Sequence, residues 1–151
     1  MYQPFNLTGH GAVVTGGNGG IGLGMARALL ASGAKVSIWG NRAEKTEAAR
    51  AQLAAECGDA SRVHALVCDV GDEAQVDAAF AQSVAALGKV HSCFANAGVS
   101  GKGNVLMDMT LDEFRRIQRV NVEGVFLTFR AAARHMAAHG EGGSLVATAS
   151  T

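Results

Sequence analysis

A glycine-rich stretch near the amino terminus has the residue types and spacing to bind phosphate. It runs from Thr15 to Gly22 as Thr-Gly-Gly-Asn-Gly-Gly-Ile-Gly, after the apolar run Ala12-Val13-Val14. Glycine adopts backbone angles closed to other residues and lets a phosphate approach the main chain. The free N–H groups and the positive dipole end of a following helix complete such a site. The stretch therefore predicts a dinucleotide site formed by Gly16, Asn18, Gly20, Ile21 and Gly22.

The spacing Gly16-x-x-x-Gly20-x-Gly22 is a variant of the general dinucleotide fingerprint G-x-G-x-x-G. A flexible loop is the alternative, and the flanking strand and helix disfavour it. Ile21, Met25, Ala28 and Leu29 recur at helical spacing and indicate the apolar side of that helix. No Gly-Lys-Ser or Gly-Lys-Thr ending follows, so a P-loop nucleotidase is disfavoured.

Strand-like and helix-like segments alternate along the rest of the chain. Capping pairs, Asp72 with Gln75 and Thr110 with Glu113, mark two helix starts. Because parallel strands need helical crossovers, the alternation predicts an α/β, Rossmann-like, doubly wound parallel sheet in one domain, 1–151. The expected strands are 12–14, 35–39, 62–68, 90–95 and 144–149, and the expected helices are 23–30, 43–57, 72–87 and 110–138.

Residues able to bind a ligand follow the ends of these strands. In a doubly wound sheet, the ligand lies outside the carboxyl ends of the strands, where the strand order reverses. Beyond the glycine-rich stretch, the candidates are Asn41, Arg42, Asp69, Val70, Asn96, Ala97, Gly98 and Ser150. An aspartate or an Asn-x-Gly segment also makes an ordinary turn, which stays the alternative for Asp69 and Asn96.

The motif Thr-Gly-x-x-x-Gly-Ile-Gly, preceded by Phe5-Asn6-Leu7-Thr8-Gly9, resembles the amino terminus of the short-chain dehydrogenase/reductase family. The resemblance implies an oxidoreductase that moves a hydride between NAD(P) and an alcohol or carbonyl substrate. It also implies that Asp69 lies near the adenine ring and that Asn96-Ala97-Gly98 steadies the central sheet against the cofactor. Family members are usually homodimers or homotetramers assembled through the long helix and its successor.

Two further residues match catalytic positions of that family. Asn121, in Val-Asn-Val-x-Gly-Val-Phe, shares an apolar helix stripe with Phe114, Ile117, Val125 and Thr128, which predicts a buried amide. The resemblance implies that Asn121 holds a water in a proton relay; a satisfied core asparagine is the alternative. The resemblance also implies that Ser150 is the catalytic serine, whose hydroxyl would hydrogen-bond the reacting carbonyl.

The end of the second strand bears on which cofactor binds. A carboxylate there hydrogen-bonds a ribose 2′-hydroxyl, whereas an arginine accommodates a 2′-phosphate. Gly40-Asn41-Arg42 contains no acid, which favours NADP over NAD with Arg42 as the phosphate partner. Against this, NADP-preferring family members often carry a basic residue just before the second motif glycine, where this chain has Gly19. A solvated arginine at a helix start is the alternative for Arg42.

The family's general acid/base, a tyrosine in a Tyr-x-x-x-Lys pair beyond the serine, has no counterpart in this sequence. The single tyrosine is Tyr2, at the opposite end. We therefore expect a chain truncated at its carboxyl end, with an unpaired edge and an uncovered face on the fifth strand. Two alternatives stay open: a non-catalytic dinucleotide-binding module, and a methyltransferase-like domain, which the lack of an acid after the second strand disfavours.

Composition excludes several partners. Thirteen basic residues balance thirteen acidic ones, which argues against nucleic acid or an anionic membrane surface. No apolar run approaches the ~18 residues of a membrane span, and no signal segment begins the chain, so a cytoplasmic protein acting on a small molecule is expected. Three cysteines without metal-like spacing are expected to be reduced. His135 and His139 lack the Glu of a His-Glu-x-x-His motif, so no metal site is predicted.

Overall fold

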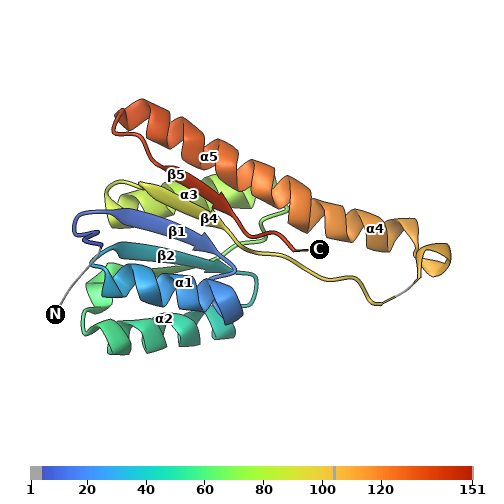
Figure 1. Cartoon of the computed structure of the whole chain (residues 1–151), viewed down its shortest axis with the longest axis horizontal. Coiled ribbons are helices and arrows are strands. Elements are labelled where there is room, and N and C mark those ends of the chain that lie inside the picture. Colours follow the sequence, from blue (N-terminus) through green and yellow to red (C-terminus); the bar gives the residue numbers. More distant parts are fainter. Residues whose placement is uncertain (1–4, 104, 151) are drawn as a thin grey trace.

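Five parallel strands form one sheet in the order β3-β2-β1-β4-β5 (Figure 1). The structure, a computed structural model, describes residues 5–103 and 105–150. The strands are β1 Gly11–Thr15, β2 Lys35–Gly40, β3 Val63–Val67, β4 Ser92–Ala95 and β5 Ser144–Ala147. The predicted doubly wound parallel sheet is confirmed; β4 begins later and β5 ends earlier than expected.

Helices cover the two faces of this sheet (Figure 1). One face carries α1 Gly20–Ala31 and α2 Ala43–Cys57, and the other carries α3 Glu73–Leu87 and α5 Gly124–His139. Right-handed crossovers explain this arrangement, because the chain reverses its direction across the sheet between β3 and β4. The shorter helices are η1 Ala60–Arg62, η2 Leu106–Asp108, α4 Leu111–Gln118 and η3 Arg119–Glu123.

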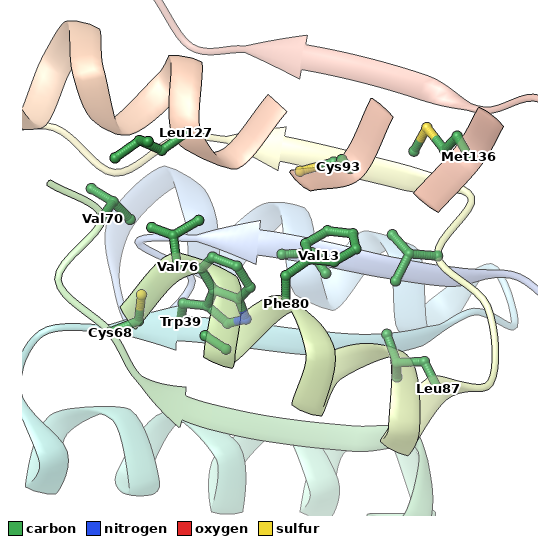
Figure 2. Close-up of a cluster of buried hydrophobic side chains, with 13 residues drawn as sticks. Val13, Trp39, Cys68, Val70, Val76, Phe80, Leu87, Cys93, Leu127 and Met136 are labelled. Atoms are coloured by element: carbon green, nitrogen blue, oxygen red, sulfur yellow. The ribbon is translucent and has the colours of Figure 1, made fainter. Parts of the chain in front are cut away.

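The larger core cluster lies between the sheet and helices α3 and α5 (Figure 2). Trp39 of β2 is fully buried there and meets the ring of Phe80 edge-on at 6.3 Å between ring centroids. The Trp39 indole N–H donates to the Ser83 hydroxyl at 3.0 Å, which satisfies the polar atom of a buried ring. Burial raises the pKa of the Cys93 thiol to about 12, so this free core cysteine stays protonated.

The apolar side of α1 differs from the expected one. Its buried residues are Gly22, Ala26 and Leu30, whereas Ile21 is 66% exposed. Small side chains on the buried side bring the helix close to the sheet, which apolar periodicity alone does not reveal. Of the residues on the expected side, Met25, Ala28 and Leu29 line an apolar groove, together with Phe5, Leu7, Ser32 and Phe94.

Both predicted helix caps are confirmed, but the predicted helix 110–138 is not one continuous α-helix. The Asp72 carboxylate accepts from the N–H of Gln75, and the Thr110 hydroxyl accepts from the N–H of Glu113. Beyond α4, residues Arg119–Glu123 form a π-turn before α5 resumes. The extra residue of a π-turn shifts which side chains face the core beyond it, and regular helical periodicity does not reveal where it occurs.

Strand β5 lies at one edge of the sheet, as expected, and pairs with β4. Leu145 and Val146 remain 41% and 40% exposed on this edge strand. Within the part of the chain that the structure describes, no helix is both long and apolar enough to cross a membrane.

Histidines bind the backbone at the amino ends of β1 and β4. The N–H of Val90 donates to Nε2 of His135 at 3.1 Å, and the N–H of Gly11 donates to Nδ1 of His91 at 3.1 Å. The N–H of Glu141 donates to Nδ1 of His139 at 3.1 Å. The accepting nitrogen of each ring must be unprotonated. Among residues 5–103 and 105–150, no group of three or more His, Cys, Asp or Glu is placed to hold a metal ion.

We predict that protonation of His135 at acid pH destabilises the folded state. Burial, followed by the nearby His139, His91 and Lys89, holds the pKa of His135 below its ordinary value of 6.5. The folded state therefore binds fewer protons than the unfolded state as His135 titrates. The stabilisation of the fold by neutral His135 is present above pH 6.5 and is lost as the pH falls through the lower folded pKa. Thermal unfolding between pH 8 and pH 5 should show a falling Tm.

The matched variants are His135→Gln, whose amide oxygen can still accept from Val90, and His10→Gln at an exposed ring. His135→Gln should flatten the dependence of Tm on pH, and His10→Gln should leave it as in the wild type. An unchanged slope in His135→Gln would contradict this assignment.

Candidate functional site

A crevice of about 470 Å³ opens at the carboxyl ends of strands β1 to β4. This is the edge at which a doubly wound sheet binds ligands, where the strand order reverses. Of the predicted site residues, those lining the crevice are Gly16, Asn18, Asn41, Arg42, Asp69, Val70, Asn96, Ala97 and Gly98. Of the others, Gly20, Ile21 and Gly22 form the first turn of α1, Asn121 lies in η3, and Ser150 lies beyond β5.

The glycine-rich turn is built by close approach of the backbone to its neighbours. Gly16 has φ 65° and Gly20 has φ 52°, in the left-handed region that favours glycine. A Cβ added to Gly22 would lie 2.3 Å from the carbonyl oxygen of Gly16 and 2.6 Å from the side-chain nitrogen of Asn96. No side chain caps the amino end of α1, and its first turn holds no acid. This helix end is therefore suited to an anion.

Asn96 joins three strands at the floor of the crevice. The hydroxyl of Thr15, which is 1% exposed, accepts from the N–H groups of Asn96 and Ala97, both at 3.0 Å. The Asn96 amide donates to the Thr15 carbonyl at 3.2 Å and accepts from the Thr148 hydroxyl at 3.0 Å. These bonds connect the ends of β1, β4 and β5. The resemblance implies that Asn96 steadies the central sheet, and this role stays a prediction. The sequence did not single out its partners Thr15 and Thr148.

The end of β2 has no room for a side chain at Gly40. A Cβ there would lie 2.1 Å from the side-chain nitrogen of Asn18 and 2.4 Å from the hydroxyl of Thr46. Asn18 donates to that hydroxyl at 3.0 Å, and the hydroxyl donates to the carbonyl of Arg42 at 2.7 Å. The glycine turn is thus tied to the start of α2, and an amide fills the space that an acid at position 40 would need.

Asp69 is held by a cation from a distant part of the chain. Its Oδ2 accepts from Nη2 of Arg119 at 2.8 Å, and its Oδ1 accepts from the N–H of Gly71 at 2.9 Å. Val70 is 6% exposed and packs against Gly124, where a Cβ would lie 2.7 Å from the valine side chain. Asp69 therefore shapes the turn after β3 while facing the crevice. Arg119 was missed because pairing across 50 positions leaves no pattern in the sequence.

The prediction that Asn121 is buried is wrong. Asn121 is exposed, and Phe114 on the same expected stripe is 48% exposed. The amide instead binds the loop after β4 in two directions: Oδ1 accepts from the N–H of Val99 at 2.8 Å, and Nδ2 donates to the Val99 carbonyl at 2.9 Å. The π-turn places the amide beside this loop rather than against the core.

Glu113 and Arg116 anchor the same loop farther along. The Glu113 carboxylate, 7% exposed, accepts from the N–H of Lys102 at 3.2 Å and from Nε of Arg116 at 2.8 Å. Arg116 also donates to the carbonyl of Ser100 at 2.8 Å. Hydrogen bonds from Arg116 hold the pKa of Glu113 at about 2. Charged and amide side chains of α4 and η3 thus hold the loop after β4, in which Val99 lines the crevice.

The predicted serine lies at the same edge of the sheet. The N–H of Thr148 donates to the carbonyl of Ala95 at 3.1 Å, so the chain still follows β4 where β5 has ended. Ser150 is exposed two residues farther on. Tyr2 and Thr151 lie outside the described residues.

The sequence model of the short chain dehydrogenase family matches residues 10–151. The chain belongs to this family. It is 37% identical over 145 residues to 2,5-dichloro-2,5-cyclohexadiene-1,4-diol dehydrogenase of Sphingobium indicum, in a match covering 96% of this chain and 56% of that protein.

Solved structures of short-chain dehydrogenases share the fold. The NADPH-dependent 3-quinuclidinone reductase from Rhodotorula rubra superposes with a TM-score of 0.87 at 32% identity, over 97% of this chain and 54% of that one. The 3-ketoacyl-(acyl-carrier-protein) reductase from Brucella melitensis, complexed with NADH, gives a TM-score of 0.85 at 35% identity, over 96% and 58%. The chain spans little more than half the length of these relatives.

We predict that Asn121→Ala releases the loop after β4. The substitution removes both side-chain bonds to Val99, which together contribute about 1–2 kcal/mol at an exposed site. Hydrogen exchange should show faster exchange of the Val99 amide, with the protection of β1 and β2 unchanged. Gln118→Ala, at the end of α4 three residues earlier, is the control and should leave Val99 protected. Equal protection of the Val99 amide in both variants would show that the hydrogen bonds of Asn121 do not hold this loop.

Proposed function

We propose that the whole protein is an NAD(P)-dependent oxidoreductase that interconverts an alcohol and a carbonyl. The observation that carries this proposal is the crevice of about 470 Å³, bordered by a glycine turn and an uncapped helix end. The residues fit the cofactor, since Gly16 and Gly20 shape the turn and the first turn of α1 has neither a side-chain cap nor an acid to oppose a pyrophosphate. The bound cofactor supplies or accepts the hydride, and the protein supplies binding, orientation and electrostatics.

In this proposal, residues 1–151 are the dinucleotide-binding domain, and its parts hold different portions of the cofactor. The amino end of α1 and its turn would bind the pyrophosphate through backbone N–H groups. Arg42 and Asp69 would hold the adenosine end, and the segment 96–98 would lie against the middle of the cofactor. The site residues proposed for the pyrophosphate are Gly16, Asn18, Gly20, Ile21 and Gly22, with Asn41, Val70, Ala97 and Gly98 along the walls.

Asn121 and Ser150 are the proposed catalytic residues of this chain. The Ser150 hydroxyl would donate a hydrogen bond to the reacting carbonyl and orient it. Because the amide of Asn121 binds Val99, its proposed part in a proton relay would depend on the loop it holds. By the resemblance, the general acid/base would be a tyrosine in a Tyr-x-x-x-Lys pair farther along the whole protein.

The cofactor proposed is NAD(P), with NADP(H) preferred. Among the solved relatives, one is titled NADPH-dependent and another was crystallised with NADH, so the family accommodates both. In this chain, Asn18 and Thr46 fill the space beside Gly40 that a ribose-binding acid would need. Arg42 stands at the start of α2 beside that space. Together these features support a 2′-phosphate.

We also propose a cytoplasmic homodimer or homotetramer that acts on a small molecule. Apolar side chains lie exposed along α4, η3 and α5: Leu111 is 59%, Val122 is 55% and Phe126 is 59% exposed. Apolar surface of this kind is typical of an interface. The three free cysteines, of which Cys68 and Cys93 are buried, fit a reducing compartment.

The test compares two glycines of α1 that are two positions apart. Gly22→Ala should weaken NADPH binding at least tenfold and abolish NADPH-dependent carbonyl reduction by the whole protein, because its Cβ would lie 2.3 Å from the Gly16 carbonyl oxygen. Gly24→Ala is the control, since a Cβ there meets nothing within 4 Å. It should bind normally and melt slightly higher, because alanine favours a helix by about 1 kcal/mol over glycine.

Titration with NADPH, NADH and S-adenosylmethionine separates the proposal from its rivals. Binding of NADPH or NADH with turnover of a carbonyl supports the oxidoreductase. Binding of either dinucleotide by the whole protein without turnover across a panel of ketones and alcohols would favour a binding module. Binding of S-adenosylmethionine instead would favour a methyltransferase-like domain.

A further inference from the structure

Arg119 lies across the turn that follows β3. Its Nη2 donates to Oδ2 of Asp69 at 2.8 Å, and the two side chains are 43% and 37% exposed. Gly71 leaves room for this contact, because a Cβ there would lie 2.6 Å from Nη1 and 2.8 Å from Cγ of Arg119. The arginine side chain therefore runs close past the backbone of Gly71, which limits where its charge can go.

The π-turn that carries this arginine is held along its length. η3 begins at Arg119, and just beyond its other end a Cβ on Gly124 would lie 2.7 Å from the side chain of Val70. In the middle of the turn, Asn121 binds the backbone of Val99 in both directions. These contacts fix the place from which the arginine reaches the carboxylate.

The two oxygens of Asp69 have separate partners. Oδ1 accepts from the N–H of Gly71 at 2.9 Å, and Oδ2 accepts from Arg119. An ionised carboxylate only accepts, and its two oxygens offer about four lone-pair sites. Because Asp69 lines the crevice, its remaining acceptor sites are open to a donor on a ligand. The direction of those sites is set by the two partners that the carboxylate already has.

The place of Asp69 in the crevice indicates which part of a dinucleotide it meets. In a doubly wound sheet, the pyrophosphate lies at the first helix and the adenosine ribose lies near the end of the second strand. β3 is the next strand outward from β2, so Asp69 lies beyond the ribose, on the side of the base. Adenine carries one exocyclic amino group, a donor that matches a carboxylate.

We propose that Arg119 is a positioning residue that holds the Asp69 carboxylate in the orientation that accepts the 6-amino group of adenine. This inference rests on the proposed dinucleotide site, and it concerns recognition of the base rather than of the ribose or its phosphate. Without the cation, Oδ2 loses its partner and the carboxylate is free to turn about its last bond. The preference for adenine over a base without the amino group should then fall.

The first experiment measures how well the whole protein distinguishes two bases. It compares the Kd of the reduced dinucleotide that the wild type binds more tightly, NADPH or NADH, with that of its hypoxanthine counterpart, in which an oxygen replaces the 6-amino group. Two acceptors then face each other, so the wild type should bind the hypoxanthine form about tenfold more weakly. In Arg119→Met this ratio should fall to about twofold. Arg119→Lys keeps a cation and should retain most of the ratio.

A second variant disturbs the contact without changing either charged partner. Gly71→Ala places a methyl group 2.6 Å from the present position of Nη1 of Arg119, and it should lower the ratio as Arg119→Met does. Gly71 does not have a positive φ, so its backbone accepts alanine. Arg115→Met is the matched control: it removes an exposed arginine of α4 and should leave the ratio as in the wild type. Thermal melting of each variant checks that the fold is intact.

The possible outcomes separate this inference from the proposed function. A wild type that binds the two bases equally would overturn the inference, and so would an unchanged ratio in Arg119→Met or in Gly71→Ala. Equal weakening of both dinucleotides leaves the ratio unchanged and would assign Arg119 a purely structural role. If Arg119→Met does not fold, Gly71→Ala decides by the same criterion. All these results leave the proposed function standing, whereas a wild type that binds neither NADPH nor NADH would refute it.

Discussion

The close contact between the end of β1, the first turn of α1 and the end of β4 is the constraint on which the rest depends. Gly22 leaves α1 free to lie against the carbonyl of Gly16 and the amide of Asn96. The buried Thr15 hydroxyl then accepts the N–H groups of Asn96 and Ala97. Because these contacts draw the strands together, the crevice at their carboxyl ends has a fixed floor and an open helix end for an anion.

The walls of the crevice are attached to that floor by polar side chains from distant parts of the chain. Asn121 holds Val99, and Arg119 holds Asp69, so two adjacent regions of the site depend on the π-turn after α4. On the opposite side, Asn18 and Thr46 tie the glycine turn to α2. Single hydrogen bonds contribute little to stability, but together they set which groups face a ligand.

The sequence predicted the parts of the fold that depend on local patterns. The strand–turn–helix at Gly16, the caps at Asp72 and Thr110, and the parallel sheet follow from spacing and composition. Contacts between distant segments escaped it. The pairing of Arg119 with Asp69 and the hydrogen bond from Asn18 to Thr46 arise from tertiary folding. Asn121 was misplaced because a helical stripe assumes regular turns, and the π-turn changes which side chains face the core.

The most direct test is fluorescence from Trp39, the single tryptophan of this sequence, during titration with NADPH of a whole protein in which any further tryptophan is replaced by phenylalanine. Trp39 lines the crevice and is buried beside the proposed adenosine site. If NADPH binds in this crevice, tryptophan emission should fall saturably, with energy transfer to the reduced nicotinamide, and an excess of NADP should reverse the loss. No saturable change, or one produced equally by S-adenosylmethionine, would contradict a dinucleotide site in this crevice.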